Sequence, residues 1–299
     1  MKALKYILLG IFIISIIFSC NSQTFSSKPF REIVLQSEGT PTKDQLMTSK
    51  KIISDRLKTL QINSFEIIQN DEKSQLTIKL KDSLDLQKLA GVLTAKGEFT
   101  FDLTYGKQEV ISKLTKLDPS MVLENNTNIH DILALLSSDA KSIDTPVIGS
   151  VELKDTAFVS KCLNSKSVKS QLPDGLQFVW GQNADKQGKY ELFAISLQSL
   201  ISGKTIKDAS VSQDAHAKTG VNITFNNEGS AKWKDVTSKN LGKAIAMVID
   251  NKVYAAPIVR SEISNGNCII TGNYTDQEAR QIVSVLRNGV LPVPFIVIN

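Results

Sequence analysis

The feature that most constrains the fold is a strand–turn–strand pattern near the end of the chain. Residues 244–249 form an unbroken apolar run of strand length, and Asp250 and Asn251 follow it directly. Asp-Asn suits a tight hairpin turn, whose backbone needs positive φ angles. Residues 253–259 then return as the second strand, with Pro257 at an edge or bulge because proline cannot donate to a ladder. The hairpin pattern alone fits an ordinary β-sandwich equally well.

The first third of the chain predicts a β-α-β-β-α-β unit. A first strand, REIVLQ, precedes Thr42 and Gln45, whose spacing is a capping-box signature for a helix over 43–60. Alternating runs predict a hairpin of strands 64–69 and 75–81, then a second helix around Leu86 to Leu93, and a fourth strand over 97–103. This order is the split βαβ, or ferredoxin-like, unit.

The end of the chain predicts one more helix and strand. Thr275 and Glu278 form another capping box, Gly289 is a helix stop, and residues 291–297 are apolar. We expect these elements to return to the first sheet. The predicted fold is therefore α+β, with a discontinuous ferredoxin-like base over 30–106 and 270–299.

Residues 107–269 are then an inserted head, also α+β. Residues 175–180 and 190–196 predict a long-looped hairpin, and residues 221–225 alternate as a partner for a strand over 209–214. Asn227 can cap a helix that contains Trp233. Several strands with one or two helices on a face make an α+β subdomain.

The N-terminus has the layout of a signal peptide. Lys2 and Lys5 precede a short apolar run over 7–18, which ends at Ser19-Cys20. Residues 17–20 (IFSC) resemble the lipobox of bacterial lipoproteins, in which the cysteine becomes lipidated. We therefore predict a signal peptide over 1–19, a lipid on Cys20 and a tether over 20–29. The alternative is an uncleaved signal anchor. The sequence does not decide which envelope membrane holds the anchor.

Composition excludes some classes of function. Without residues 1–19, which carry two lysines, the formal charge falls from +5 to +3 over 280 residues, too little to indicate nucleic-acid binding. The other cysteines, Cys162 and Cys268, are read as two buried thiols rather than as a pair, although an oxidising compartment permits a disulfide.

We find no catalytic, metal-binding or cofactor motif. The chain has only two histidines, His130 and His216, in polar, loop-like settings, and it lacks the nucleophile-elbow, zinc-protease and phosphate-loop patterns. Asp250 and Asp276 sit at element boundaries, where turn and cap roles are expected. We therefore predict a non-enzyme without catalytic residues, cofactor or metal.

Four ordered segments resemble the first large periplasmic domain of the SecD protein-export family. They are LISGKTIKDASVS at 200–212, VNITFNNEGSAKW at 221–233, GKAIAMVIDNKVYAAPIV at 242–259 and ITGNYTDQEARQIVSVLRNGVLPVP at 270–294. Residues 49–62 and 96–104 resemble weaker motifs of the same domain. The sequence ends at Asn299, where the family would enter its second membrane helix, and the family's D-L-x-G-G motif is also absent from residues 24–40. We therefore do not expect the resemblance to carry over the proton-coupled membrane part.

The resemblance implies an accessory role in protein export. The expected partners are the SecYEG/SecDF translocon and unfolded secretory polypeptides, with the protein held at the periplasmic side of a membrane by its lipid. As a polypeptide-binding surface we name Tyr254, Pro257, Val259 and Ile263, because a sequence-tolerant binder needs exposed apolar groups or an open strand edge. The alternative is a repurposed envelope lipoprotein that keeps the fold and serves another partner.

Overall fold

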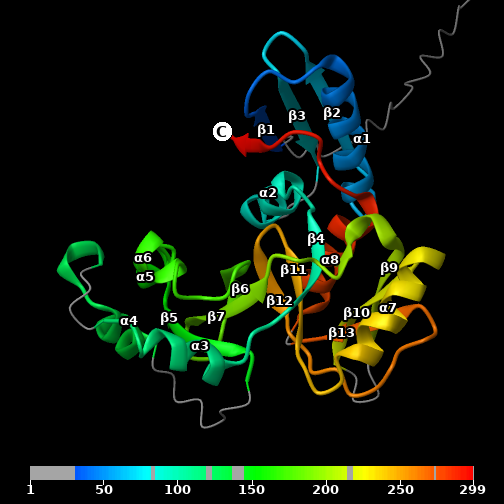
Figure 1. Ribbon diagram of the computed structural model, residues 1–299. Helices are drawn as coiled ribbons and strands as arrows, with labels where there is room; N and C mark the ends of the chain where they lie inside the picture. The colour runs from blue at the N-terminus through cyan, green and yellow to red at the C-terminus, as the bar shows by residue number, and fades with distance from the viewer. Residues whose placement is uncertain are drawn as a thin grey trace, which may run out of the picture.

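The computed structural model describes residues 31–81, 85–118, 123–136, 145–213, 218–272 and 274–298. The predicted signal peptide, Cys20, the tether and His216 lie outside these residues. Figure 1 shows a base at the top and two lobes below it, one built on β5–β7 and one on β9, β10 and β13. The strands β5–β7 belong to a seven-stranded sheet that extends from the first of these lobes towards the second.

The base is a four-stranded antiparallel sheet in the order β14-β1-β3-β2. Its helix α1 (Lys43–Thr59) begins at the predicted capping box of Thr42 and Gln45 and joins β1 to β2. The second and third strands form the predicted hairpin. The strands of the base are β1 (Arg31–Ser37), β2 (Phe65–Asn70), β3 (Gln75–Leu80) and β14 (Phe295–Val297).

One predicted strand pairs with a different sheet. Residues 97–103 do form a strand, β4 (Phe99–Leu103), but it lies beside β11 in the seven-stranded sheet, and β14 takes the fourth place in the base. The reason is the burial of Phe99 and Phe101, which pack in a core with Trp233 rather than in the core of the base. The base sheet is thus completed by the last strand of the chain, and the expected return of the run 291–297 to the first sheet is confirmed for residues 295–297.

The seven-stranded sheet has the order β5-β7-β6-β12-β11-β4-β8. The predicted hairpin is confirmed as β6 and β7, but its long loop is not, because β6 continues to Ala184 and β7 begins at Lys189, which leaves a loop of residues 185–188. Strand β12 runs parallel to β6 and pairs with it at Val253 and Gly181. Helices α3–α6 cover the β5–β7 end (Figure 1). The elements are β5 (Val147–Glu152), β6 (Leu176–Ala184), β7 (Lys189–Ser196), β8 (Ile201–Ser202), β11 (Ile245–Ile249), β12 (Lys252–Ala255), α3 (Lys107–Leu114), the 3-10 turn η1 (Glu124–Asn126), α4 (Ile129–Leu135), α5 (Leu153–Leu163) and α6 (Lys166–Lys169).

The other lobe is a three-stranded antiparallel sheet, β13-β10-β9, packed with two helices. The predicted pairing of 209–214 with 221–225 is confirmed up to Gln213. The cap of α7 is Asn226 rather than Asn227, because the Asn226 side chain accepts the Gly229 N–H at 2.9 Å. The elements are the 3-10 turn η2 (Gly203–Thr205), β9 (Ile206–Gln213), β10 (Thr219–Phe225), α7 (Asn227–Lys239), β13 (Asn267–Thr271) and α8 (Asp276–Asn288).

An aromatic core joins this lobe to the seven-stranded sheet. The ring of Trp233 lies 4.6 Å from that of Phe101 and 5.6 Å from that of Phe225, measured between centroids. Helix α8, predicted for the base, contributes Ala279, Ile282 and Leu286 to the same core. The domain boundaries near residues 106 and 270 stay a prediction.

Both remaining cysteines are buried free thiols, as predicted. Burial raises the pKa of the Cys268 thiol to about 12, so this group stays protonated and unreactive at neutral pH. His130 is exposed, on α4 rather than in a loop. Within the described ranges, no helix combines the length and the apolar character needed to cross a membrane. The α+β fold class is confirmed.

Candidate functional site

The predicted hairpin turn is the starting point of the site. Asp250 and Asn251 have φ angles of 49° and 60°, as the turn requires, and β11 and β12 flank them. Val248 pairs with Val253, whereas Met247 pairs with Ala255. Tyr254 is therefore the extra residue of a β-bulge, a device that re-aims a side chain and leaves backbone groups of the bulged residue outside the ladder.

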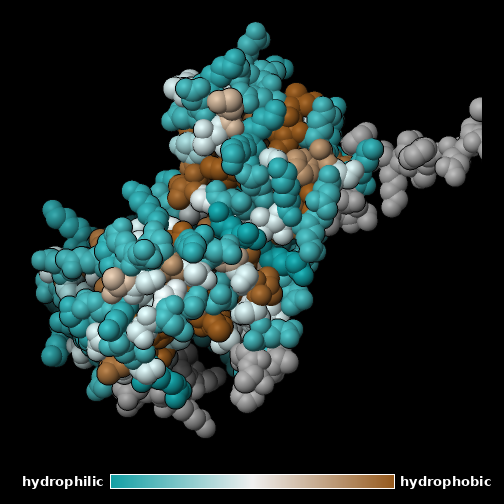
Figure 2. Space-filling model, turned by 90° about the vertical axis from the view of Figure 1, so that its right-hand side faces the viewer, coloured by the Kyte–Doolittle hydropathy of each residue, from teal (hydrophilic) through white to brown (hydrophobic). Residues whose placement is uncertain are grey.

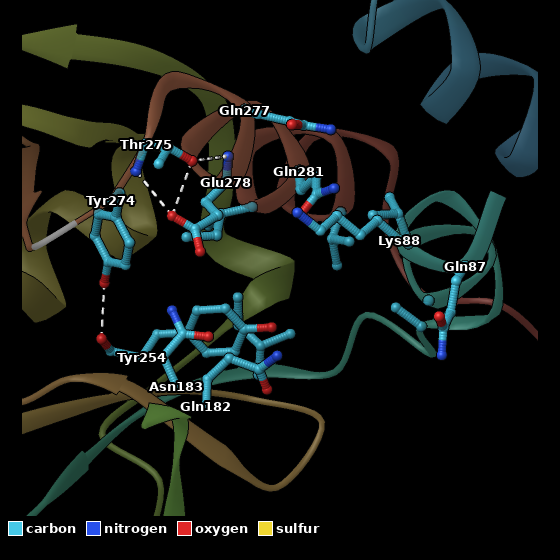
Figure 3. Close-up of a pocket in the computed structure, with 16 residues that line it drawn as sticks. Gln87, Lys88, Gln182, Asn183, Tyr254, Tyr274, Thr275, Gln277, Glu278 and Gln281 are labelled. Atoms are coloured by element: carbon cyan, nitrogen blue, oxygen red, sulfur yellow. Dashed lines mark hydrogen bonds between the residues drawn. The ribbon is translucent and has the colours of Figure 1, made fainter. Parts of the chain in front are cut away.

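A second tyrosine hydrogen-bonds the backbone carbonyl of the bulged residue. The Tyr274 hydroxyl donates to the backbone carbonyl of Tyr254 at 2.7 Å (Figure 3). Burial, with a smaller contribution from Asp250, raises the pKa of Tyr254 to about 12. Burial first, then Tyr254 and Glu278, raises the pKa of Tyr274 as well. Both phenols are therefore neutral hydrogen-bonding groups at physiological pH.

These tyrosines border a groove of about 520 Å³ between α2 (Leu86–Thr94), α8, β6 and the β11–β12 hairpin. Its apolar lining includes Val92, Ile249, Ile282 and Val285, which belong to the aromatic core. The groove therefore lies where the base meets the lower lobes, and its two helical walls come from segments almost two hundred residues apart in the sequence. We call it the amide groove, for the side chains described next.

Five amide side chains line the amide groove. In Figure 3, Gln182 and Asn183 of β6 lie across the cavity from Gln281 of α8. Gln87 of α2 and Gln277 of α8 complete the set. A carboxamide carries both donors and an acceptor, like a peptide group. Within the described part of the chain none of the five side chains has a hydrogen-bond partner in the protein; Gln87, Asn183 and Gln277 are exposed and the other two half-buried, so each can exchange water for a ligand.

The charged groups of the groove are few. Lys88 contributes one ammonium group from α2. The Glu278 carboxylate already accepts from the backbone N–H of Thr275 at 2.8 Å and from its hydroxyl at 2.9 Å, in the predicted capping box. The chemistry of the groove is thus mainly that of neutral hydrogen bonding above an apolar floor, which suits an uncharged, extended ligand.

The structure separates the four residues that the sequence placed on one surface. Tyr254 lines the amide groove, whereas Pro257, Val259 and Ile263 do not. Pro257 is exposed, while Val259 and Ile263 are half-buried against the aromatic core. The chain around Pro257 still pairs with the β11 side, since its carbonyl accepts the Ile245 N–H at 3.1 Å. A binding role for these three residues stays a prediction.

Sequence reasoning missed the amides of the groove. Gln and Asn are common on protein surfaces, so nothing in the sequence distinguishes Gln182 or Gln281 from solvated side chains. The capping box of α8 is recognisable in the sequence and fixes the start of the helix, so Gln277 and Gln281, four residues apart, are expected on the same helix face. That these residues face β6 follows only from the tertiary packing.

The fold and the groove define a mixed α+β module with a polar groove between its base and its lower lobes. Residues 179–293 match a protein-family model described as the P1 head subdomain of SecDF. The fold also resembles a solved SecDF, described as a membrane component that enhances protein export, with a TM-score of 0.52, 21% identity, and coverage of 90% of this chain and 98% of that one. These findings relate the chain to the P1 region of SecD and SecDF.

Relatives in sequence are protein translocase subunits SecD. That of Rhodothermus marinus is 38% identical over 158 residues, which cover 51% of this chain and 25% of the relative. That of Rickettsia conorii is 28% identical over 255 residues, which cover 79% of this chain and 48% of the relative. The chain thus spans a quarter to about half of the length of these relatives.

Proposed function

We propose that this protein is a periplasmic SecD-like module that assists protein export by holding an extended, unfolded polypeptide in the amide groove. The observation that carries the proposal is the set of five amide side chains without internal partners, at the junction of base and lower lobes. Amides can pair with the main chain of any extended polypeptide, and main-chain pairing tolerates any sequence.

The surface supports a polar mode of binding. In Figure 2 the face on view is mainly hydrophilic, and apolar side chains gather in separate groups rather than in one continuous patch. A large apolar patch is the usual mark of binding by hydrophobic contact. Recognition through hydrogen bonds above a small apolar floor fits the groove better, with Tyr254 as one wall.

The direct test is the affinity for a permanently unfolded protein, such as a reduced and carboxymethylated secretory protein, measured by fluorescence anisotropy. We expect the double variant Gln182→Ala/Gln281→Ala to bind about tenfold more weakly, which equals roughly 1.4 kcal/mol. Lys232→Ala, an exposed residue of α7 outside the groove, is the matched control. Unchanged affinity of the double variant would exclude the groove.

Two further variants separate the groove from the surface expected from the sequence. Tyr254→Asp changes a residue common to both, whereas Pro257→Asp changes only the predicted surface. We expect Tyr254→Asp to weaken binding and Pro257→Asp to leave it unchanged, with circular dichroism confirming the fold of each. Equal losses from both variants would move the site to the segment around Pro257 that follows β12.

We also propose that Cys20 carries a lipid that holds the module to an envelope membrane. The support is the lipobox-like sequence before Cys20. Acyl chains bind the bilayer by about 0.8 kcal/mol per buried CH₂. Metabolic labelling with palmitate tests this: we expect label in the wild type and in Ser22→Ala, and none in Cys20→Ser. Label that persists in Cys20→Ser would contradict the anchor.

In-cell photocrosslinking is the experiment that identifies the partner. With a photoreactive residue in place of Gln281, we expect adducts to translocon subunits or to many exported chains, and few adducts from the same probe at Ser238 of α7. A single unrelated envelope protein at position 281 would instead support the repurposed role.

A further inference from the structure

Helix α1 contains a fully buried arginine. Arg56 has no exposed surface, and its neighbours Ile53 and Leu57 are apolar core residues of the base. Burial lowers its pKa to about 10, partly offset by the negative charge of Asp250. The side chain is therefore a cation at neutral pH. A buried charge destabilises a fold unless hydrogen-bond partners compensate for its lost hydration, so the partners of Arg56 show what its side chain does.

The guanidinium group holds the ends of two other helices. One terminal nitrogen, Nη1, donates to the carbonyls of Val92, at 3.0 Å, and Ala95, at the end of α2. The other, Nη2, donates to the carbonyl of Gly289, directly after α8, at 3.0 Å. The last carbonyls of a helix lack intrahelical donors, and a cation there is favourable.

The backbone of Arg56 holds α8 from a second point. The buried Ser284 hydroxyl donates to the Arg56 carbonyl at 3.0 Å. One turn further along α8, the Asn288 side chain donates to the Thr59 hydroxyl at 3.1 Å. Main chain and side chain of Arg56 thus fix α8 against α1, while the side chain also fixes α2.

The loop after α2 approaches Arg56 and Gly289 so closely that its Gly97 has no space for a side chain. Gly97 has a φ of +86°, and a Cβ there would lie 2.7 Å from the Gly289 carbonyl oxygen and 2.8 Å from Arg56 Nη2. The N–H groups of Gly97 and Glu98 both donate to the Asp250 carboxylate, each at 2.9 Å. Asp250 belongs to the hairpin turn, four residues before Tyr254. The loop therefore ties α2 to a third wall of the amide groove.

These contacts have a common geometric consequence. Val92 and Ala95, whose carbonyls Arg56 holds, line the amide groove on one side, and α8 lines it on another. α2 has only nine residues and would be marginal alone. We propose that Arg56 sets the width of the amide groove by fixing α2 against α8, and that it is a positioning residue for the bound polypeptide. The claim that Arg56 positions a bound polypeptide rests on the proposed function, whereas the claim about groove width does not.

A distance across the groove tests the proposal without any ligand. Spin labels on Gln87→Cys and Gln182→Cys, in the full chain with Cys20→Ser, report the separation of α2 and β6 by pulsed electron resonance. Cys162 and Cys268 are buried, and the chain without the two added cysteines is the blank. We expect one narrow distance in the parent and a broader, shifted distribution in Arg56→Met.

Graded variants distinguish positioning from simple stabilisation. Arg56→Lys keeps the charge but cannot fork to both helices, so we expect an intermediate distribution. Ser284→Ala removes one contact and should fold even if Arg56→Met does not, with a smaller broadening. Arg287→Met, also on α8, removes an exposed ion pair to Asp208 of β9 and should leave the distance unchanged.

Binding of the carboxymethylated protein is then measured, without spin labels, for each Arg56 variant. We expect Arg56→Met to lose about tenfold in affinity, roughly 1.4 kcal/mol, and Arg56→Lys to lose less. A narrow, unchanged distance in folded Arg56→Lys and Ser284→Ala would overturn the positioning role. If the distances change as expected but the parent binds no unfolded protein, the control of groove width stands and the proposed function fails.

Discussion

Two polar clusters lie side by side between α2 and α8, and they differ in how their hydrogen bonds are used. Around Arg56, only Nε of the guanidinium lacks a partner among the residues described, and the cluster is buried. In the amide groove, the five carboxamides have no recorded internal partner. A buried cluster whose hydrogen bonds are mostly satisfied rigidifies a fold, whereas polar groups without internal partners in a cavity are available to a ligand. The same two helices thus carry one cluster that fixes the packing and one for which we propose a binding role.

The largest effect on stability is expected from Arg56→Met. The change leaves the carbonyls of Val92, Ala95 and Gly289 without their donor, and each buried unsatisfied group costs about 1–3 kcal/mol. We expect the free energy of unfolding, measured in urea, to fall by about 3 kcal/mol or more. If Arg56→Met lowered the free energy of unfolding no more than Arg287→Met does, the buried cluster would not stabilise the fold and the contrast with the groove would fail.

Asp250→Ala should have the next largest effect. Its carboxylate accepts from Gly97 N–H and Glu98 N–H, and hydrogen bonds to charged groups contribute about 1.5–3 kcal/mol. We expect a loss of about 2 kcal/mol. Asp250→Asn keeps one carbonyl acceptor and should lose less. Equal losses in the two variants would mean that the carboxylate charge and its second oxygen, rather than the retained acceptor, carry the stabilisation.

The tyrosine pair should make stability depend on pH in the alkaline range. In the unfolded chain the phenol of Tyr254 ionises near pH 10, whereas in the folded protein its pKa is raised to about 12. Its contribution is therefore fully present below pH 10 and is lost between about pH 10 and 12. We expect Tyr254→Phe to flatten the fall in unfolding free energy over that window relative to wild type.

Tyr274→Phe is the companion measurement. It removes the hydroxyl that satisfies the bulged carbonyl of Tyr254, so it should lower stability at pH 8 as well, unlike Tyr254→Phe. If the two variants behaved alike at pH 8, the hydrogen bond between the tyrosines would contribute nothing measurable.

The smallest effect on stability is expected in the groove itself. Gln182→Ala/Gln281→Ala removes side chains that have no recorded internal partner, and such surface changes usually stay within about 0.5 kcal/mol. The same variant is expected to lose affinity for unfolded protein. A large loss of stability here would show that the amides hold the fold, and the contrast between the clusters would disappear.

The local elements were readable because their signals lie within a few residues. The capping boxes at Thr42 and Thr275 and the hairpin turn at Asp250-Asn251 are where the sequence predicts them. Each depends on a side chain that meets the backbone two or three residues away, or on the φ angles that one residue type tolerates. The β-α-β-β start of the base follows from the same kind of signal.

The pairing of strands could not be read in the same way. The run 97–103 has the composition of a strand, but its partner β11 lies about 150 residues later, and the base sheet competes for it. Periodicity shows which face of a strand is apolar, not which sheet that face joins. The burial of Phe101 against Trp233 decided the outcome.

The candidate site was predicted only through Tyr254. The hairpin that carries it follows from the local sequence, whereas the bulge that turns it into the groove depends on the register between β11 and β12. The sequence by itself therefore determined the helices, the hairpins and the likeness to SecD. Only the tertiary structure decided that β4 leaves the base sheet, which groups Arg56 contacts and where the amide groove lies, because each of these joins groups far apart in the chain through packing and long-range hydrogen bonds.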